Sequence, residues 1–295
     1  MKIAVFTKNR SNPAYEAARL GAQRAAALFG AELQHFVPAT PDDAQQQSAL
    51  VHEALAGAPD ALVFTPVHPT RVAAAIAAVQ AAGIPIFGFV SRMANGACVS
   101  HVGACDARLA ADIAGFLFQR MLGRGRVVIV EGPSEAVTSI ERVQAFEAAA
   151  RTHPGIEIVG RCNGDYLQEP ARLAFAALLR ELPQIDAVLA ANDIMAMGVL
   201  DALQAADRQA LVVGVNAIPQ AVAAIRDGRM LASADFNAML MCFLATECAI
   251  RHARGEAVPR EIELPVAIVE RSNCALWDLP YEQRRLPTLA ELNLN

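Results

Sequence analysis

This chain has few charged residues, few aromatic residues and no excess of positive charge. Of its 295 residues, 19% are charged and 5% are aromatic, and the formal net charge is −5. No basic stripe for binding nucleic acid or anionic lipid is present, so we expect no nucleic-acid partner. Hydrophobic residues make up 54% of the chain, which supports large buried cores and excludes global disorder.

Long apolar runs and recognisable cysteine patterns are also missing. Charge, Gly or Pro interrupts every hydrophobic stretch before the roughly 18 residues that a membrane-spanning helix requires. The six cysteines form no CxxC pair, so we interpret most of them as small buried hydrophobic residues and expect no metal site. Met1 and Lys2 lead directly into a strand-like run, which leaves no room for a signal peptide. The expectation is a cytoplasmic protein, or one whose leader has been removed.

Motifs of the common enzyme classes are absent as well. The sequence contains no GxSxG elbow, no HExxH, no phosphate-binding loop and no GxGxxG between a strand and a helix. GRGR at 123–126 precedes a strand, which is the wrong order for a dinucleotide-binding motif. We therefore predict no catalytic residue, no cofactor and no enzymatic activity.

Strand-like and helical runs alternate along most of the chain, which is typical of an α/β fold with doubly wound parallel sheets. The first such unit ends with the strand-like run at 99–103. A second copy of the same plan begins with a helix that Asp106 is expected to cap, and continues to the strand-like run at 187–192. A length of 295 residues also favours two domains.

The elements after residue 230 do not complete a third unit, so we expect them to finish the two existing sheets. The chain then passes between two lobes three times, near 103–106, 234–237 and 263–266. This arrangement is a three-segment hinge with a cleft between the lobes. The predicted domains are 1–104 plus 236–264 for the N-terminal lobe, and 105–235 plus 265–295 for the C-terminal lobe and tail.

Hydrogen-bonding side chains follow most of the predicted strands at their carboxyl ends. In a parallel α/β sheet this edge binds ligands, because strand ends and helix N-termini converge there. Amides, hydroxyls, an arginine and aromatic planes together suit a small polyhydroxylated ligand, a sugar or polyol. The residues selected in this way are Lys8, Asn12, Tyr15, Thr65, Ser91, Arg92, Tyr166, Asn192, Asn216 and Phe236.

Several of these positions also have a structural interpretation. Asn12 can simply cap the helix that follows it, and Thr65 can be a turn hydroxyl. Asp193 begins a helix, so we interpret its carboxylate as structural. Asn192 and Asn216 each end a buried strand, and their amides would need an unexplained partner if they bound no ligand. Thr70 is expected to cap a further helix.

Six segments, in order, resemble the type I periplasmic solute-binding proteins, specifically the ribose-binding-like branch that serves sugar ABC importers. The resemblance covers essentially residues 2–270, and the NDxMAxG block followed by VGxN is its most specific part. The segments are SNPAYEAARLGAQRAA at 11–26, AGIPI at 82–86, VSHVG at 99–103, ERVQAF at 141–146, AANDIMAMGVLDAL at 190–203 and VVGVNAIPQAVAAIRDGRMLAS at 212–233.

The resemblance implies a periplasmic protein, its signal peptide removed, with two lobes that close over one sugar and perform no chemistry on it. An ABC transporter permease is the implied partner, and a monomer is expected. The family match extends the ligand contacts to Arg142, which the pattern alone would assign to a helix surface. The ten residues selected above are the other implied contacts.

This chain departs from the family at several of these positions. Val90-Ser91-Arg92 stands where ribose binders have an Asp-Arg pair, and Asn216 stands where they have an aspartate. Ala14 replaces an aromatic residue, and Lys8 replaces a small hydroxyl residue. Because two carboxylates are lost and a lysine is gained, a sugar acid is an alternative ligand.

Two further alternatives belong to other functional classes. The same fold serves the ligand-sensing domain of lactose-repressor-like transcriptional regulators, which would need a DNA-binding segment ahead of Met1. An enzyme on this fold would be recognised by turnover of its ligand. The tail from residue 272 extends beyond the resemblance, and we expect Trp277, the only tryptophan, to anchor it against a lobe.

Overall fold

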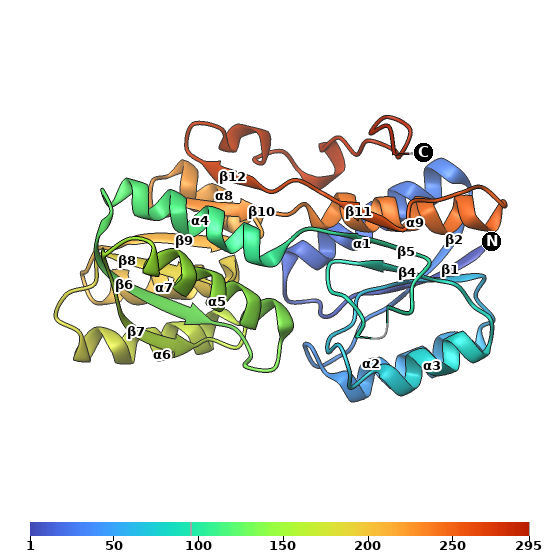
Figure 1. Ribbon diagram of the computed structural model, residues 1–295, viewed down its shortest axis with the longest axis horizontal. Helices are drawn as coiled ribbons and strands as arrows, with labels where there is room; N and C mark the ends of the chain where they lie inside the picture. Colours follow the sequence, from blue (N-terminus) through green and yellow to red (C-terminus); the bar gives the residue numbers. More distant parts are fainter. Residues whose placement is uncertain (95, 295) are drawn as a thin grey trace. The chain divides into compact units, whose positions relative to one another are not determined.

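The computed structural model describes residues 1–94 and 96–294 and divides the chain into two compact units. Unit 1 comprises Met1–Ala104, Asn237–Pro265 and Tyr281–Asn295, and unit 2 comprises Cys105–Phe236 and Val266–Pro280. Within the described residues each unit contains one six-stranded sheet that carries helices (Figure 1). The predicted α/β class with two doubly wound sheets is confirmed.

The sheet of unit 1 is entirely parallel and has the strand order β11-β5-β4-β3-β1-β2. Helices α1 and α9 pack against each other on one face, and α2 packs against α3 on the other (Figure 1). The strands are β1 Lys2–Phe6, β2 Glu32–Phe36, β3 Ala61–Phe64, β4 Ile86–Phe89, β5 Ser100–Gly103 and β11 Glu261–Glu263. The helices are α1 Pro13–Phe29, α2 Ala44–Ala56, α3 Ala73–Ala81, α9 Ala238–Ala253 and the short 3-10 turn η2 Tyr281–Gln283.

The core of unit 1 follows directly from its composition. Strands β3, β4 and β5 are buried at every residue, as expected for parallel strands that are covered on both faces. Phe6 stacks on Phe36 with ring centroids 4.9 Å apart, and Phe64 lies 5.1 Å from Phe6. Helix α1 buries a stripe of Ala and Gly, which lets α9 approach closely.

The sheet of unit 2 has the order β12-β10-β9-β8-β6-β7, and it is parallel except for β12, which pairs antiparallel with β10. Helix α4 packs against α5, and α7 packs against α6 and α8. The strands are β6 Arg124–Glu131, β7 Gly155–Asn163, β8 Ala187–Ala190, β9 Leu211–Val215, β10 Ala232–Asp235 and β12 Ala267–Glu270. The helices are α4 Asp106–Arg120, α5 Val137–Arg151, α6 Gln168–Glu181, α7 Asp193–Ala205, α8 Pro219–Arg226 and the 3-10 turn η1 Cys274–Leu276.

Two of the three expected helix caps differ from the structure. Asn12 does cap α1, because its side chain accepts a hydrogen bond from the N–H of Ala14. Thr70 does not cap α3, which begins later; its N–H donates to His68 Nδ1 in a turn instead. Asp106 is the first residue of α4 and not its cap, and its carboxylate is bound elsewhere.

The C-terminal tail differs from the expected division of the chain. We predicted that residues 265–295 belong to the C-terminal lobe, but Tyr281–Asn295 groups with unit 1. The cause is a set of contacts with α1 and α9 that no periodic pattern in the tail reveals. The segment 263–271 contains the last residue of β11, which belongs to the sheet of unit 1, and all of β12, which belongs to the sheet of unit 2.

The cysteines fit their predicted role only in part. All six are free thiols, and Cys242, Cys248 and Cys274 are buried. Cys98 and Cys162 are half-buried, and Cys105 is exposed. Burial raises the pKa of the Cys248 thiol to about 11, so this group is an inert thiol at neutral pH.

Candidate functional site

In unit 1, three predicted residues are joined by hydrogen bonds at the carboxyl ends of β1, β3 and β4. Lys8 is only 7% exposed, and its Nζ donates to Ser91 Oγ at 2.8 Å. The N–H of Ser91 in turn points to Thr65 Oγ1 at 3.4 Å, and Thr65 is fully buried. The structure therefore brings Lys8, Thr65 and Ser91 together, as the position of the strand ends predicted.

A carboxyl group that the sequence analysis did not select lies beside this cluster. The N–H of Asp42 donates to the carbonyl of Lys8 at 3.2 Å, and Asp42 Oδ2 accepts from Asn9 Nδ2 at 3.0 Å. Burial raises the pKa of Asp42, while the nearby Lys8 ammonium opposes this shift. No local pattern identifies Asp42, because it reaches the cluster from the loop after β2.

Asn12 and Tyr15 lie at the beginning of α1, next to the end of β1. Asn12 Oδ1 is 3.0 Å from the N–H of Ala14, and the Asn12 N–H donates to Asn9 Oδ1 at 3.0 Å. The structural interpretation of Asn12 as a helix cap is confirmed. Tyr15 is half-buried in the first turn of α1, and a ligand role for either residue stays a prediction.

Arg92 points to a different partner. Its guanidinium makes a bidentate ion pair with Glu261 of β11, with both N–O distances at 2.9 Å. The side chain of Arg92 is 65% exposed, and the bond to Glu261 raises its pKa. Arg92 is thus held at the β11 edge of the sheet, whereas Lys8 is held by Ser91.

In unit 2, Arg142 is buried and its guanidinium has three neighbours. Nε and Nη2 each lie 2.6 Å from Asp106 Oδ1, and Nη1 donates to the carbonyl of Ala191 at 2.7 Å. The guanidinium carbon lies 5.7 Å from the ring centroid of Phe236. Arg142 is 4% exposed, so the pattern-based assignment to a helix surface is wrong. The ligand contact that the resemblance implies for Arg142 stays a prediction.

Among the predicted site residues, Asn216 has a buried polar atom that is available to a ligand. It follows β9 with a φ of 120°, a positive value that is uncommon for residues other than glycine. Its Oδ1 is buried, and no hydrogen-bond partner for this atom exists among residues 1–94 and 96–294. A buried amide oxygen without a partner is costly unless a donor from outside the chain reaches it.

Tyr166 is placed by an unusual backbone conformation after β7. Its φ is 59°, and its hydroxyl lies 3.1 Å from Thr138 Oγ1 at the start of α5. Gly132 follows β6, and a Cβ at that position would overlap the Tyr166 ring, so a glycine there makes room for the aromatic plane.

Asn192 and Asp193 turn out to have mainly structural partners. Asn192 caps α7, because its Oδ1 accepts from the N–H of Met195 at 2.9 Å. Asp193 is fully buried and accepts hydrogen bonds from Ser233 Oγ and from the N–H of Ile218. Burial raises the pKa of Asp193 to about 7. The predicted structural role of Asp193 is confirmed. The side-chain oxygen of Asn192 also has a partner within the chain, the N–H of Met195, which the sequence did not reveal.

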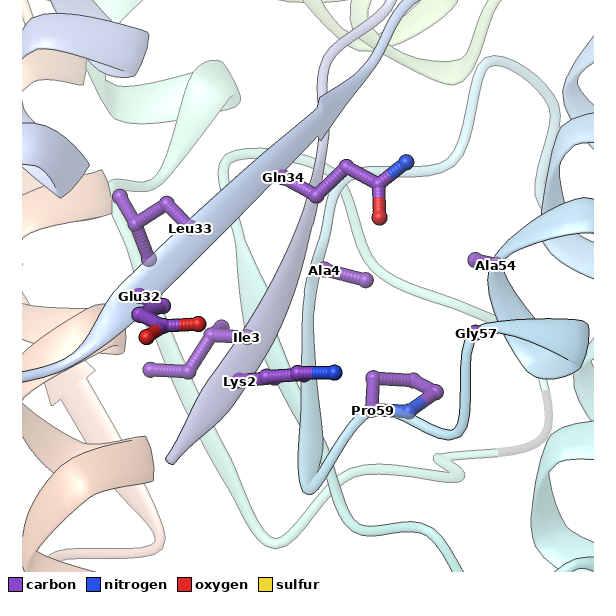
Figure 2. A pocket seen from close by; sticks show the side chains of 9 residues that line it. All are labelled: Lys2, Ile3, Ala4, Glu32, Leu33, Gln34, Ala54, Gly57 and Pro59. Atoms are coloured by element: carbon purple, nitrogen blue, oxygen red, sulfur yellow. The ribbon is translucent and has the colours of Figure 1, made fainter.

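Two surface hollows lie at the other ends of the strands. One, of about 380 Å³, is lined by the first residues of β1 and β2 and by Ala54, Gly57 and Pro59 (Figure 2). The other, of about 670 Å³, lies beside the first residues of β8 and β9. Both are at the amino ends of parallel strands, and ligand sites of open α/β sheets form outside the carboxyl ends.

The described side chains include groups that can form hydrogen bonds with a ligand, but they form no cluster that could hold a metal ion. Within residues 1–94 and 96–294, no cluster of three or more His, Cys, Asp and Glu side chains is arranged to hold a metal ion. Over the same part of the chain, no helix is both long enough and apolar enough to cross a bilayer. The amides, hydroxyls, cations and aromatic rings at the strand ends can pair with hydroxyl groups and cover a sugar ring.

Comparison with known proteins agrees with this chemistry. Residues 3–257 match the model of a family described as periplasmic binding protein domain. The ribose import binding protein of Bacillus subtilis (strain 168) is 26% identical over 267 residues, which cover 90% of this chain and 86% of that protein.

Two solved structures have the same fold. An ABC transporter periplasmic solute-binding protein from Actinobacillus succinogenes 130z with bound D-allose has a TM-score of 0.88 and 26% identity, and the match covers 93% of this chain and 99% of that one. An ABC transporter solute-binding protein from Mycobacterium smegmatis with bound glycerol has a TM-score of 0.87 and 28% identity, over 95% of this chain and 97% of that one.

Proposed function

Because the chain belongs to the periplasmic binding protein domain family, we propose that it is the substrate-binding component of an ABC importer. The ligand is a small neutral carbohydrate, a monosaccharide or polyol. The relatives named above are a ribose import protein and solute-binding proteins with bound D-allose or glycerol. These names support a hydroxyl-rich ligand for this chain and leave the identity of the sugar to experiment.

The observation that carries the proposal is the buried Oδ1 of Asn216 in unit 2, which has no hydrogen-bond partner in the part of the chain that the structure describes. In the same unit Arg142 is held rigidly by Asp106 and Ala191 beside the ring of Phe236. A sugar hydroxyl can donate to the amide oxygen, while the guanidinium donates to sugar oxygens and the ring covers a C–H face. Lys8, Ser91 and Thr65 supply a second set of polar groups on unit 1.

The charges near these residues favour a neutral ligand over a sugar acid. Arg142 is already paired with the carboxylate of Asp106 at 2.6 Å. Asp42 lies close enough to Lys8 for the ammonium to lower the pKa of its carboxyl against the effect of burial. Each cation therefore has an acidic neighbour, and an added carboxylate would find less uncompensated positive charge than the sequence alone predicted.

The mechanism is binding with closure and no reaction on the ligand. A ligand that contacts both units in the closed form shifts the equilibrium toward that form, because it binds the closed form more tightly. The closed, loaded protein then delivers its sugar to a permease. We infer a periplasmic location, which the family and the importer relatives support, and we propose that the protein acts as a monomer.

A thermal-shift panel tests this function. The panel contains D-ribose, D-allose, D-fructose, L-arabinose, xylitol, myo-inositol and glycerol, and each aldose is paired with its aldonate. A ligand present at 100 times its dissociation constant should stabilise the protein by about 2.7 kcal/mol. We expect a neutral member to raise the melting temperature and to be recovered unchanged. A larger shift with an aldonate than with its aldose would contradict the proposal of a neutral ligand. Conversion of the ligand to a product would contradict the proposal that the protein only binds it.

Two variants connect the panel to the site. Arg142→Met should abolish the shift, whereas the matched control Arg180→Met, on the exposed surface of α6, should retain it. An equal response of both variants would show that Arg142 is not part of the binding site.

A further inference from the structure

The C-terminal segment belongs to both units, which gives the chain a fourth passage between them. Val266–Pro280 is part of unit 2, and Tyr281–Asn295 is part of unit 1. The other three passages follow Ala104, Phe236 and Pro265. The fourth lies between Pro280 and Tyr281, where the sequence predicted no passage.

The first half of the segment is fastened to β10 and α8 of unit 2. Strand β12 pairs with β10 along four residues. Beyond it, Trp277 Nε1 donates to Asp235 Oδ2 at 2.7 Å, and Asp278 Oδ2 accepts from Arg226 Nη1 of α8 at 2.9 Å. The expected anchoring of the tail by Trp277 is confirmed within this unit.

The second half is fastened to α1 and α9 of unit 1. Arg24 Nη1 of α1 donates to the carbonyl of Arg284 at 2.6 Å. Leu289 is buried, and its N–H donates to Glu247 Oε2 of α9 at 2.9 Å. Glu247 is itself fully buried and lies 2.8 Å from Arg251 Nη2. A buried carboxylate that accepts a backbone N–H is a specific attachment, because its loss leaves a polar group unpaired.

The two attachments are separated by very little chain. Asp278 is held by unit 2, and the 3-10 turn η2 starts at Tyr281 in unit 1, three residues later. Three fully extended residues span at most about 11 Å. Pro280, one of the residues between, restricts the backbone further. The fourth passage is therefore a short tether, because only a few residues connect the attachment at Asp278 to the part of the chain in unit 1.

This tether also reaches the proposed ligand site. Asp235, the acceptor of the Trp277 indole, ends β10 and directly precedes Phe236. Phe236 is the ring that lies against Arg142. The indole bond thus fixes the strand end that carries a proposed sugar contact.

We propose that residues 266–294 form a strap that limits how far the two units can separate in the ligand-free protein. The restraint on the units follows from the two attachments and the short passage alone. Its effect on affinity rests on the proposed function, since a binding-competent form that is more populated raises the apparent affinity in proportion.

The test adds slack to the strap without touching either attachment. Twelve Gly and Ser residues are inserted between Leu279 and Pro280. The matched control carries the same insertion between Glu256 and Ala257, two exposed residues in the loop that follows α9 within unit 1. Deleting residues 281–295 would be less informative, because it uncovers Glu247 and can unfold unit 1.

The main readout is the radius of gyration of the ligand-free protein in solution, which needs no sugar. We expect the strap insertion to increase it beyond the control insertion, with similar melting temperatures for both variants. We also expect D-ribose, used as the probe, to bind the strap variant about threefold to tenfold more weakly than the control. Equal radii of gyration for the two variants would overturn the strap. If D-ribose does not bind the unmodified protein, D-ribose is not its ligand. The comparison of the radii of gyration still tests the strap, because it is made without ligand.

Discussion

Both Nε and Nη2 of Arg142 lie 2.6 Å from the same carboxylate oxygen of Asp106. The two residues are 36 positions apart in the chain, and the pair joins the first turn of α4 to α5. Because Arg142 is almost completely buried, its charge depends on this partner.

Removal of the Asp106 carboxylate should therefore destabilise unit 2 strongly. We expect Asp106→Ala to lower the free energy of unfolding by about 3–5 kcal/mol, because it leaves an unpaired buried guanidinium. Asp106→Asn keeps an acceptor and should have a smaller effect. Urea unfolding measures both variants, with the exposed Asp112→Asn on the same helix as the control for the change in net charge. Equal stability of the Asp106→Ala and Asp112→Asn variants would contradict the assigned role of the pair.

Asn216 should matter for binding and not for stability. Its Oδ1 has no partner among the described residues, and glycine adopts the φ of 120° freely. Asn216→Gly should change the free energy of unfolding by less than about 1 kcal/mol. Affinity for the sugar that the panel identifies should fall by about tenfold to a hundredfold, which corresponds to one lost hydrogen bond in a desolvated site. Calorimetric titration and urea unfolding separate the two effects, and a stability loss at unchanged affinity would argue against a ligand contact.

Asp193 should make the protein less stable as the pH rises. Burial raises its folded pKa from an ordinary value of 3.8 to about 7. Between these values the unfolded chain has released the proton while the folded chain retains it, so stability decreases with rising pH. The loss amounts to at most about 4 kcal/mol. Unfolding free energies at pH 5 and pH 7.5 should therefore differ less in Asp193→Asn than in the exposed control Asp201→Asn on the same helix, and parallel pH profiles would disprove this assignment.

The sequence predicted the parts of the fold that depend on local patterns. Continuous apolar runs such as Ala61–Phe64 are characteristic of parallel strands, and the alternation with helices was sufficient to predict two doubly wound sheets. Features that depend on distant partners were not predicted. The pairing of Asp106 with Arg142 and of Glu247 with the N–H of Leu289 each joins segments that share no local signal.

The same distinction explains the results for the candidate site. Strand-end positions identified Lys8, Thr65 and Ser91, because parallel topology alone brings strand ends together. Local sequence could not decide between Asn192 and Asn216, which both follow buried strands. The hydrogen bonds in the structure distinguish the two residues. The side-chain oxygen of Asn192 accepts a hydrogen bond from the N–H of Met195, whereas that of Asn216 accepts none from the described residues.

Gly21 should be intolerant of any side chain. A Cβ at this position would overlap the backbone carbonyl oxygen of Met239, where α1 and α9 cross. Neither backbone can move without disturbing the core of unit 1, so Gly21→Ala should cost at least about 1–3 kcal/mol. Gly115→Ala is the matched control, because nothing lies within 4 Å of its Cβ and alanine favours a helix by up to about 1 kcal/mol. Urea midpoints that shift in the same direction for both variants would contradict the close crossing.

His101 should make the protein less stable at acid pH, the opposite direction to Asp193. Its ring is buried between Gly88 and Gly103, with Arg92, Glu261 and Cys98 as its ionisable neighbours. Burial, followed by the charge of Arg92, lowers the His101 pKa from 6.5 to about 4. The stability that the neutral ring provides is complete above pH 6.5 and is lost as the pH falls toward 4, by at most about 3 kcal/mol. We therefore expect His101→Met to flatten the decrease in unfolding free energy between pH 6.5 and 4. The exposed control His52→Met on α2 should leave this decrease unchanged, and an unchanged slope in both variants would assign the acid sensitivity to other groups.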